Sequence, residues 1–194
     1  MVETLPGLVA GVIFQGVIDY KMSANLLKLA KESAGAGDYT KALEAVNSAI
    51  EINPSLAGAW FLKGTILRSL GRLEEAIESL EKALKFNPSM DKALCEKGSI
   101  LLDLNSPREA LIFLEWATMV NPSNACAFRV TGDSYYKLKR KREAITAYKK
   151  AIELGDQDAA QALKDCMSKM EMYEKLIFGD LAGTDDQTPK SSES

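Results

Sequence analysis

Histidine is absent from the 194 residues of the sequence, and aromatic residues make up only 7% of them. Imidazole is the commonest general base and metal ligand near neutral pH, so the usual starting point for a catalytic or metal centre is missing. Cysteine is scarce too, since Cys95, Cys126 and Cys166 lie far apart and form no CxxC pair. This spacing excludes a thioredoxin-like or zinc-ribbon motif. We expect no catalytic residue, metal or cofactor, and a protein that works in the reducing cytoplasm.

Long hydrophobic runs are also missing. A helix that spans a bilayer needs about 18 or more apolar residues, and the longest apolar run, residues 5–18, is shorter. The only charge before it is Glu3, so it lacks the basic start of a secretory signal. The net charge of −3 and the pI of about 5.2 argue against general nucleic-acid binding by the whole surface.

What the sequence does contain is a pattern that returns every 34 residues. We number the copies as repeats 1 to 4, each with positions 1 to 34; they cover residues 23–56, 57–90, 91–124 and 125–158. Positions 8, 20 and 27 are small, positions 4 and 24 are bulky, and position 32 is proline in repeats 1 to 3. The residues at position 8 are Ala30, Gly64, Gly98 and Gly132, and those at position 20 are Ala42, Ala76, Ala110 and Ala144.

The spacing predicts two helices in each repeat. Small residues at positions 8 and 20 let the two helices approach closely, and the bulky residues at positions 4 and 24 fill the space beside that contact. Proline at position 32 cannot continue the second helix and marks the passage to the next repeat. One repeat alone could not bury its apolar face, so we expect successive repeats to stack.

The pattern resembles the tetratricopeptide repeat family, most clearly in repeat 2. The matching residues there are Trp60, Gly64, Leu67, Ala76, Leu80, Ala83 and Pro88. The departures are position 7, where Lys63, Lys97 and Thr131 replace the preferred leucine, and position 32 of repeat 4, which is Asp156. The resemblance implies an all-α, right-handed α-solenoid of helix-turn-helix units. It also implies a non-catalytic adaptor whose first helices line a concave groove for a peptide or protein.

In this family, positions 2, 5, 9, 12 and 13 usually face the groove. For this chain they include Leu27, Lys31, Phe61, Thr65, Arg68, Lys92, Cys95, Ser99, Leu102, Asp103, Cys126, Arg129, Asp133, Tyr136 and Lys137. Five of these residues are basic and two are acidic, and we expect Phe61, Leu102 and Tyr136 to add exposed apolar area. We predict a ligand that carries acidic residues beside apolar anchors; a solvated face of average charge is the alternative. Only Lys92 matches the positions with which family members clamp chaperone C-terminal carboxylates, so we expect no such clamp.

A basic turn in repeat 4 supports a second hypothesis. It contains Lys139, Arg140, Lys141 and Arg142, with Lys149 and Lys150 nearby. Such a run is typical of a phosphate-binding patch, and it would also suit an acidic protein partner. Turns are polar in any case, so an ordinary solvated turn is the simplest interpretation.

The two ends of the chain lie outside the repeats. Residues 1–22 hold the uncharged run, which counting backward places where a second helix of a missing repeat would lie. It could cap repeat 1 and mediate self-association, cap it as a monomer, or attach to a membrane surface. At the other end an apolar stripe predicts a capping helix over residues 159–178, or a partner-binding helix, followed by a disordered tail at 179–194. The residues of that stripe are Ala159, Leu163, Cys166, Met170, Tyr173 and Ile177.

Overall fold

The structure, a computed structural model, describes the backbone of residues 5–178 and the side chains of residues 15–168. Every regular element in this range is a helix. The chain forms two compact units, Met1–Pro122 and Ser123–Ser194, which we call the N-terminal and C-terminal units. The tail that we expect to be disordered, residues 179–194, lies outside the described residues.

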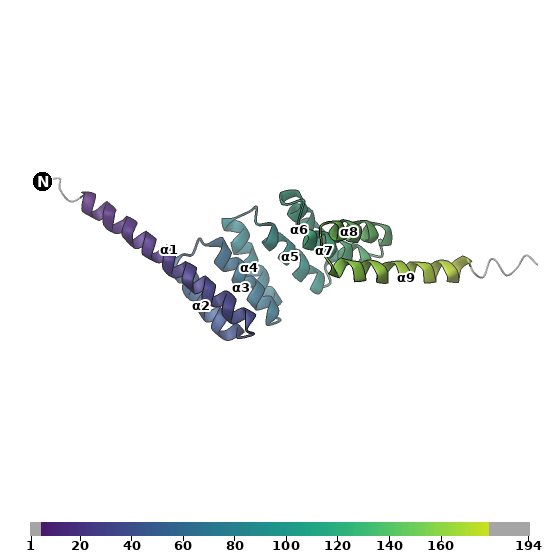
Figure 1. The fold of residues 1–194 in the computed structure, drawn as a ribbon, viewed down its shortest axis with the longest axis horizontal. Helices are drawn as coiled ribbons and strands as arrows, with labels where there is room; N and C mark the ends of the chain where they lie inside the picture. The colour runs from purple at the N-terminus through teal and green to yellow at the C-terminus, as the bar shows by residue number, and fades with distance from the viewer. Residues whose placement is uncertain (1–4, 179–194) are drawn as a thin grey trace, which may run out of the picture. The chain divides into compact units, whose positions relative to one another are not determined.

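The N-terminal unit consists of three antiparallel helix pairs (Figure 1). The pairs are α1 (Leu5–Gly35) with α2 (Tyr39–Ile52), α3 (Ala57–Ser69) with α4 (Leu73–Phe86), and α5 (Asp91–Asp103) with α6 (Pro107–Val120). The second helix of one pair packs against the first helix of the next, α2 on α3 and α4 on α5. This stack of helix-turn-helix repeats confirms the predicted fold class.

The C-terminal unit contains repeat 4 and the helix that follows it. Here α7 (Ala125–Lys137) pairs with α8 (Lys141–Glu153), and α9 (Asp158–Phe178) packs mainly along α8. Ala159 and Cys166 of α9 are buried, and Leu163 packs beside them against the same core. The side chains of Met170, Tyr173 and Ile177, which continue the predicted stripe, lie outside the described set.

Glycines at position 8 let the paired helices touch. A Cβ on Gly64 would lie 2.9 Å from Leu80 Cγ, and one on Gly98 would lie 2.7 Å from Leu114 Cγ. Such distances are shorter than packed carbon atoms allow, so any side chain would push the helices apart. The bulky residue at position 24 therefore lies directly over position 8, where the sequence pattern predicted it beside the contact.

The turn inside each repeat depends on a left-handed residue at position 15. That residue is Gly37 with φ 81° in repeat 1, Gly71 with φ 73° in repeat 2, Asn105 with φ 58° in repeat 3 and Lys139 with φ 63° in repeat 4. Glycine adopts this conformation without strain and asparagine tolerates it, whereas lysine rarely adopts it. The basic turn of repeat 4 therefore carries a locally unfavourable backbone.

The unusual Lys97 at position 7 is explained by two partners. Its Nζ lies 2.7 Å from Oε1 of Glu81 and 4.2 Å from the centre of the Phe113 ring. The side chain is buried along its length, while Glu81 remains exposed to water. The ammonium group thus stays paired, and the methylene groups occupy the space of the leucine that the family prefers.

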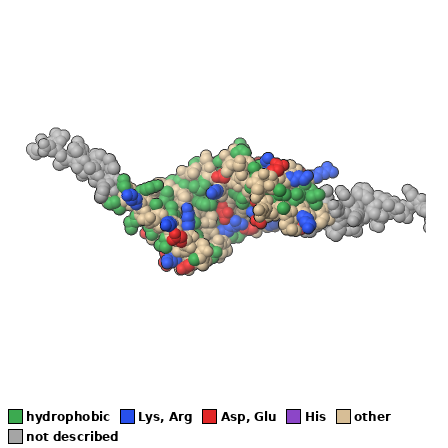
Figure 2. Space-filling view, in the orientation of Figure 1, with side chains coloured by type: hydrophobic (Ala, Val, Ile, Leu, Met, Phe, Trp, Pro, Cys, Tyr) green, Lys and Arg blue, Asp and Glu red, His purple; other side chains and the backbone are tan. Residues whose placement is uncertain are grey.

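The N-terminal segment continues directly into repeat 1 as one helix, α1, which extends past the end of α2 (Figure 1). The hydroxyl of Ser23 donates to the carbonyls of Asp19 and Tyr20 across the expected boundary. The prediction of a separate helix in the place of a missing repeat is therefore wrong, because the backbone makes no turn at residue 22. Exposed side chains at residues 17, 18, 20 and 22 leave an apolar surface there, next to the grey atoms in Figure 2.

Candidate functional site

The predicted groove residues of the N-terminal unit lie on α1, α3 and α5. Lys31, Lys92 and Asp103 are exposed, and Phe61 is half-buried against the core around Leu80. The remaining residues divide into half-buried Leu27, Thr65 and Arg68 and buried Cys95, Ser99 and Leu102.

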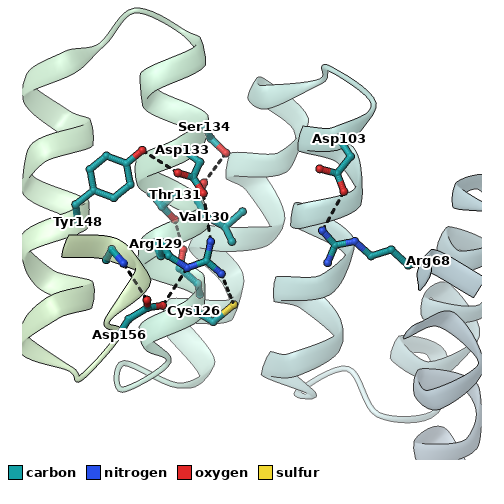
Figure 3. Close-up of polar contacts among 12 residues, drawn as sticks. Arg68, Asp103, Cys126, Arg129, Val130, Thr131, Asp133, Ser134, Tyr148 and Asp156 are labelled. Carbon is teal, nitrogen blue, oxygen red and sulfur yellow. Dashed lines mark hydrogen bonds and ion pairs between the residues drawn. The ribbon is translucent and has the colours of Figure 1, made fainter. Parts of the chain in front are cut away.

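Arg68 joins α3 to α5. Its Nη1 donates to Oε1 of Glu96 at 3.1 Å, and its Nη2 donates to Oδ2 of Asp103 at 2.9 Å, a contact visible in Figure 3. Burial lowers the pKa of Arg68, but the carboxylates of Glu96 and Asp103 outweigh it and hold this pKa above its usual value. Position 12 of repeat 2 therefore shares one face with positions 6 and 13 of repeat 3.

Two expectations about this face need correction. Leu102 was expected to be exposed, but only 8% of it is accessible, so it belongs to the packing of α5. The count of basic residues also overstated the available charge, because Arg68 is neutralised by two acids and Glu96 was not among the predicted residues. Position 6 is one helical turn before position 9, and this spacing could have pointed to Glu96.

Arg129 is the centre of a polar network in the C-terminal unit (Figure 3). Its Nε donates to Oδ2 of Asp156 at 3.1 Å, its Nη1 to Oδ2 of Asp133 at 3.5 Å, and its Nη2 to Sγ of Cys126 at 3.8 Å. Asp156 also accepts from the backbone N–H of Ala159 and so caps the start of α9. This explains why position 32 of repeat 4 is not proline: the aspartate connects α7 to α9.

Asp133 accepts a second hydrogen bond, from the hydroxyl of Tyr148 on α8 at 2.8 Å. Burial raises the pKa of Asp133, and the bonds from Tyr148 and Arg129 only partly offset this. Burial together with the bond to Asp133 raises the pKa of Tyr148 far above its usual value. The tyrosine is therefore a permanent donor, and it fixes Asp133 on the face of α7.

The last groove candidates and the basic turn lie at the end of α7. Tyr136 is half-buried in the core of this unit and Lys137 is exposed. In the turn, Arg140 lies over the ring of Tyr135 at 4.7 Å, and its Nε donates to Glu143 at 2.9 Å. Lys139 and Arg142 are exposed, and Lys141 is half-buried. Part of the turn's charge is thus used inside the unit.

An open hollow of about 680 Å³ lies on the face of α7 and α8, and the predictions did not include it. Phe128, Thr131, Tyr135 and Ile145 line it, and Lys149 and Lys150 lie among the charged residues of its lining. The sequence pattern assigned the bulky residue at position 4 to packing, so this surface was not expected to be open.

A metal centre and a membrane span are two other features to consider in the described part of the chain. No group of three or more acidic or cysteine side chains there is arranged to hold a metal ion. No helix among the described residues is long and apolar enough to cross a membrane.

Comparison with curated proteins finds a short relative, the uncharacterized protein MJ0572 of Methanocaldococcus jannaschii. The two sequences are 54% identical over 44 residues, which is 23% of this chain and 51% of that protein. The chain therefore matches about half the length of this relative, and the likeness extends over little more than one repeat.

Several solved structures share the fold. The tetratricopeptide repeat protein TTC0263 of Thermus thermophilus has a TM-score of 0.69 and 22% identity, over 87% of this chain and 93% of that one. MamA from Desulfovibrio magneticus RS-1 has a TM-score of 0.66 and 22% identity, over 86% and 98%. YrrB, described as a tetratricopeptide repeat protein with an unusual peptide-binding site, has a TM-score of 0.61 and 22% identity, over 77% and 78%.

The family itself is identified by sequence. Residues 27–91 and 95–159 each match the family described as tetratricopeptide repeat, and together they make up more than half of the chain. The two matches agree with the 34-residue register of the sequence and with the helix pairs of the structure. The chain belongs to the tetratricopeptide repeat family.

Proposed function

We propose that this protein is a non-catalytic adaptor in the cytoplasm, which binds a segment of another protein on the face shared by α1, α3 and α5. The observation that carries the proposal is the pair of ion pairs from Arg68 to Glu96 and Asp103. Because these contacts hold positions of α3 and α5 on one face, a ligand meets a preformed surface, which lowers the entropic cost of binding. YrrB, which shares the fold, is described as having a peptide-binding site.

The ligand that suits this face carries acidic residues beside an apolar anchor. Lys31 and Lys92 are exposed and form no ion pair with any residue that the structure describes. Phe61 lies on α3, between α1, which carries Lys31, and α5, which carries Lys92. The side chain of Phe61 is only half-buried. Two separated cations beside an aromatic ring favour an acidic, partly apolar segment. The charge of Arg68 is already neutralised by Glu96 and Asp103, so we assign this residue to orienting the face and not to binding the ligand.

The test uses a phage-displayed library of random dodecapeptides, selected on the full chain. We expect selected peptides enriched in Asp and Glu beside Leu or Phe. The double variant Lys31→Glu, Lys92→Glu should bind them at least about tenfold more weakly. The control is Lys41→Glu, Lys85→Glu, which changes the net charge equally at exposed positions of the second helices α2 and α4. Acidic peptides that bind both double variants equally would contradict the assignment of the face.

Binding of nucleic acid or of an acidic surface through residues 139–142 is the second candidate. Exposed Lys139 and Arg142 favour it, while the bonds of Arg140 to Glu143 and Tyr135 disfavour it. A phosphate-driven complex weakens steeply with salt. Binding of unrelated single-stranded DNA to the parent, lost in the variant Lys139→Gln, Arg142→Gln, would favour this candidate over the adaptor.

We also propose that the chain self-associates through the apolar run at residues 5–18. The exposed side chains of Val17, Ile18 and Tyr20 at its end support this, because a monomer seldom keeps such a surface without use. Attachment to a membrane surface is the competing explanation. Light scattering of the parent, with and without lipid vesicles, separates the two.

A further inference from the structure

Helix α6 carries a stripe of exposed hydrophobic side chains on its outer face. Ile112 is 63% exposed, Trp116 42% and Met119 80%, and Val120 extends the stripe at 36%. The spacings of four and three residues place the first three side chains on one side of the helix. We call this set the α6 stripe.

The stripe is particular to repeat 3. Its three main residues occupy positions 22, 26 and 29, which are polar or charged in the other repeats. The residues at these positions are Glu44, Ser48 and Glu51 in repeat 1, Glu78, Lys82 and Lys85 in repeat 2, and Thr146, Lys150 and Glu153 in repeat 4. Ordinary packing of the repeat therefore has no need of hydrophobic side chains here.

Stacking of repeats in register would not cover these positions. Both α2 and α4 are followed by a helix packed against them, and their residues at positions 22 and 29 are nevertheless exposed. A helix stacked on α6 in the same register would therefore leave these positions exposed as well. Burial of the α6 stripe requires a contact of another kind.

The size of the α6 stripe limits what can cover it. The four side chains expose on the order of 400 Å², about the size of a large patch on a monomer. A stable dimer buries about 800 Å² on each partner, so two α6 stripes in contact with each other would fall short. The α6 stripe extends over about three helical turns, and an area of this size fits the side of one apolar helix.

The chain itself contains a helix of this kind. Residues 5–18 carry no charge, and α1 continues past the end of α2, so none of the described helices pairs with this part. Val17, Ile18, Tyr20 and Met22 are exposed where it leaves the repeat. Neither the residues of the α6 stripe nor residues 5–18 include a charged side chain, so each set offers the other an apolar contact.

We propose that the α6 stripe is the docking site for the N-terminal part of α1 from a second copy of the chain. The inference rests on the proposed self-association and names the surface that receives the segment. In a two-fold dimer this contact occurs twice, because each copy donates its segment and presents its α6 stripe. The doubled area then approaches that of a stable dimer.

The experiment compares the full-length parent with two variants by light scattering. The stripe variant, Ile112→Glu, Trp116→Lys, Met119→Lys, carries on α6 the residues that α4 has at the same positions, which a helix of this array accepts. The segment variant, Val17→Glu, Ile18→Lys, changes two exposed residues of α1. Circular dichroism checks that both variants keep the helix content of the parent.

We expect the parent to have twice the monomer mass and each variant to be a monomer at the same concentration. Mixing the variants should restore pairing at a higher concentration, because one intact segment then meets one intact stripe. A monomeric parent would overturn both the self-association and the docking site. A stripe variant that still dimerises, beside a monomeric segment variant, would overturn the docking site alone.

Two further outcomes would also overturn the docking site. One is a mixture of the two monomeric variants that stays monomeric at every concentration, because the stripe and the segment would then not be each other's partners. The other is parent binding to phosphatidylglycerol vesicles that the stripe variant loses, because the stripe would then face lipid.

Discussion

The ring of Tyr148 lies directly over Gly132, so closely that a Cβ on this glycine would be 2.5 Å from the ring carbons Cδ1 and Cε1. The ring has little freedom to move away, because its hydroxyl is held by Asp133 at 2.8 Å. The contact joins α7 to α8 in the core of the C-terminal unit. The corresponding contact at Gly64 is looser, since its nearest neighbour, Cγ of Leu80, would lie 2.9 Å away.

Replacing Gly132 by alanine should therefore destabilise the protein. Overpacking costs about 1–3 kcal/mol, and the better helix propensity of alanine returns about 1 kcal/mol of it. We expect a net loss of up to about 2 kcal/mol in the free energy of unfolding, measured by urea titration, and a smaller loss for Gly64→Ala. The control is Gly58→Ala on α3, where a Cβ would meet nothing within 4 Å. A loss at Gly58 equal to that at Gly132 would contradict the packing described.

Asp133 should give an unusual dependence of stability on pH. Its pKa is raised above the ordinary value of 3.8 by burial, so the folded state binds its proton more tightly than the unfolded state does. Its contribution to stability is therefore largest at low pH and is lost as the pH rises from about 3.8 through the raised pKa. The stability of the parent minus that of Asp133→Asn should fall over this interval and then stay constant. Thermal melts between about pH 3 and 7 would measure it, and a difference that rises with pH would show that the carboxylate is stabilised as an anion.

Lys139 adopts φ 63° at a position that is glycine in repeats 1 and 2. A non-glycine residue in the left-handed region costs about 1–2 kcal/mol, so Lys139→Gly should stabilise the C-terminal unit by about 1 kcal/mol, observed as a higher melting temperature. Asn105→Gly should give a smaller gain, because asparagine tolerates this conformation. Lys139→Ala separates conformation from charge: it removes the ammonium group and keeps the strain. A gain from alanine as large as that from glycine would assign the effect to charge.

The repeated pattern was sufficient to predict the helix pairs. Small residues at positions 8 and 20 and proline at position 32 determine where two helices meet and where the second one ends, and these are local requirements. The same periodicity led to a wrong break at residue 22, because the register was extended into a segment that lacks the turn residues of the repeats. Tyr20 stands where the proline of position 32 would mark the passage to the next repeat, so the helix simply continues.

The α6 stripe could have been recognised from the sequence. Ile112, Trp116 and Met119 differ in polarity from the other repeats at the same positions, and an alignment of the four copies shows this without coordinates. The family resemblance implies a function for the groove positions only. The resemblance implies no function for the outer face, and the exposure of this face depends on how the chain folds.

The sequence by itself determined the family, the register of the repeats and the face of each helix that packs, because these follow from periodic spacing within about 34 residues. Only the tertiary structure decided which charges remain available. Arg68 is neutralised by residues 28 and 35 positions further along the chain, and Arg129 by one 27 positions further along. A position in the repeat pattern of the family predicts which face of its helix a side chain occupies. It does not predict which residue of the next helix lies opposite. Electrostatic pairing depends on distances of about 3–4 Å between side-chain atoms, and packing of one helix on the next sets those distances.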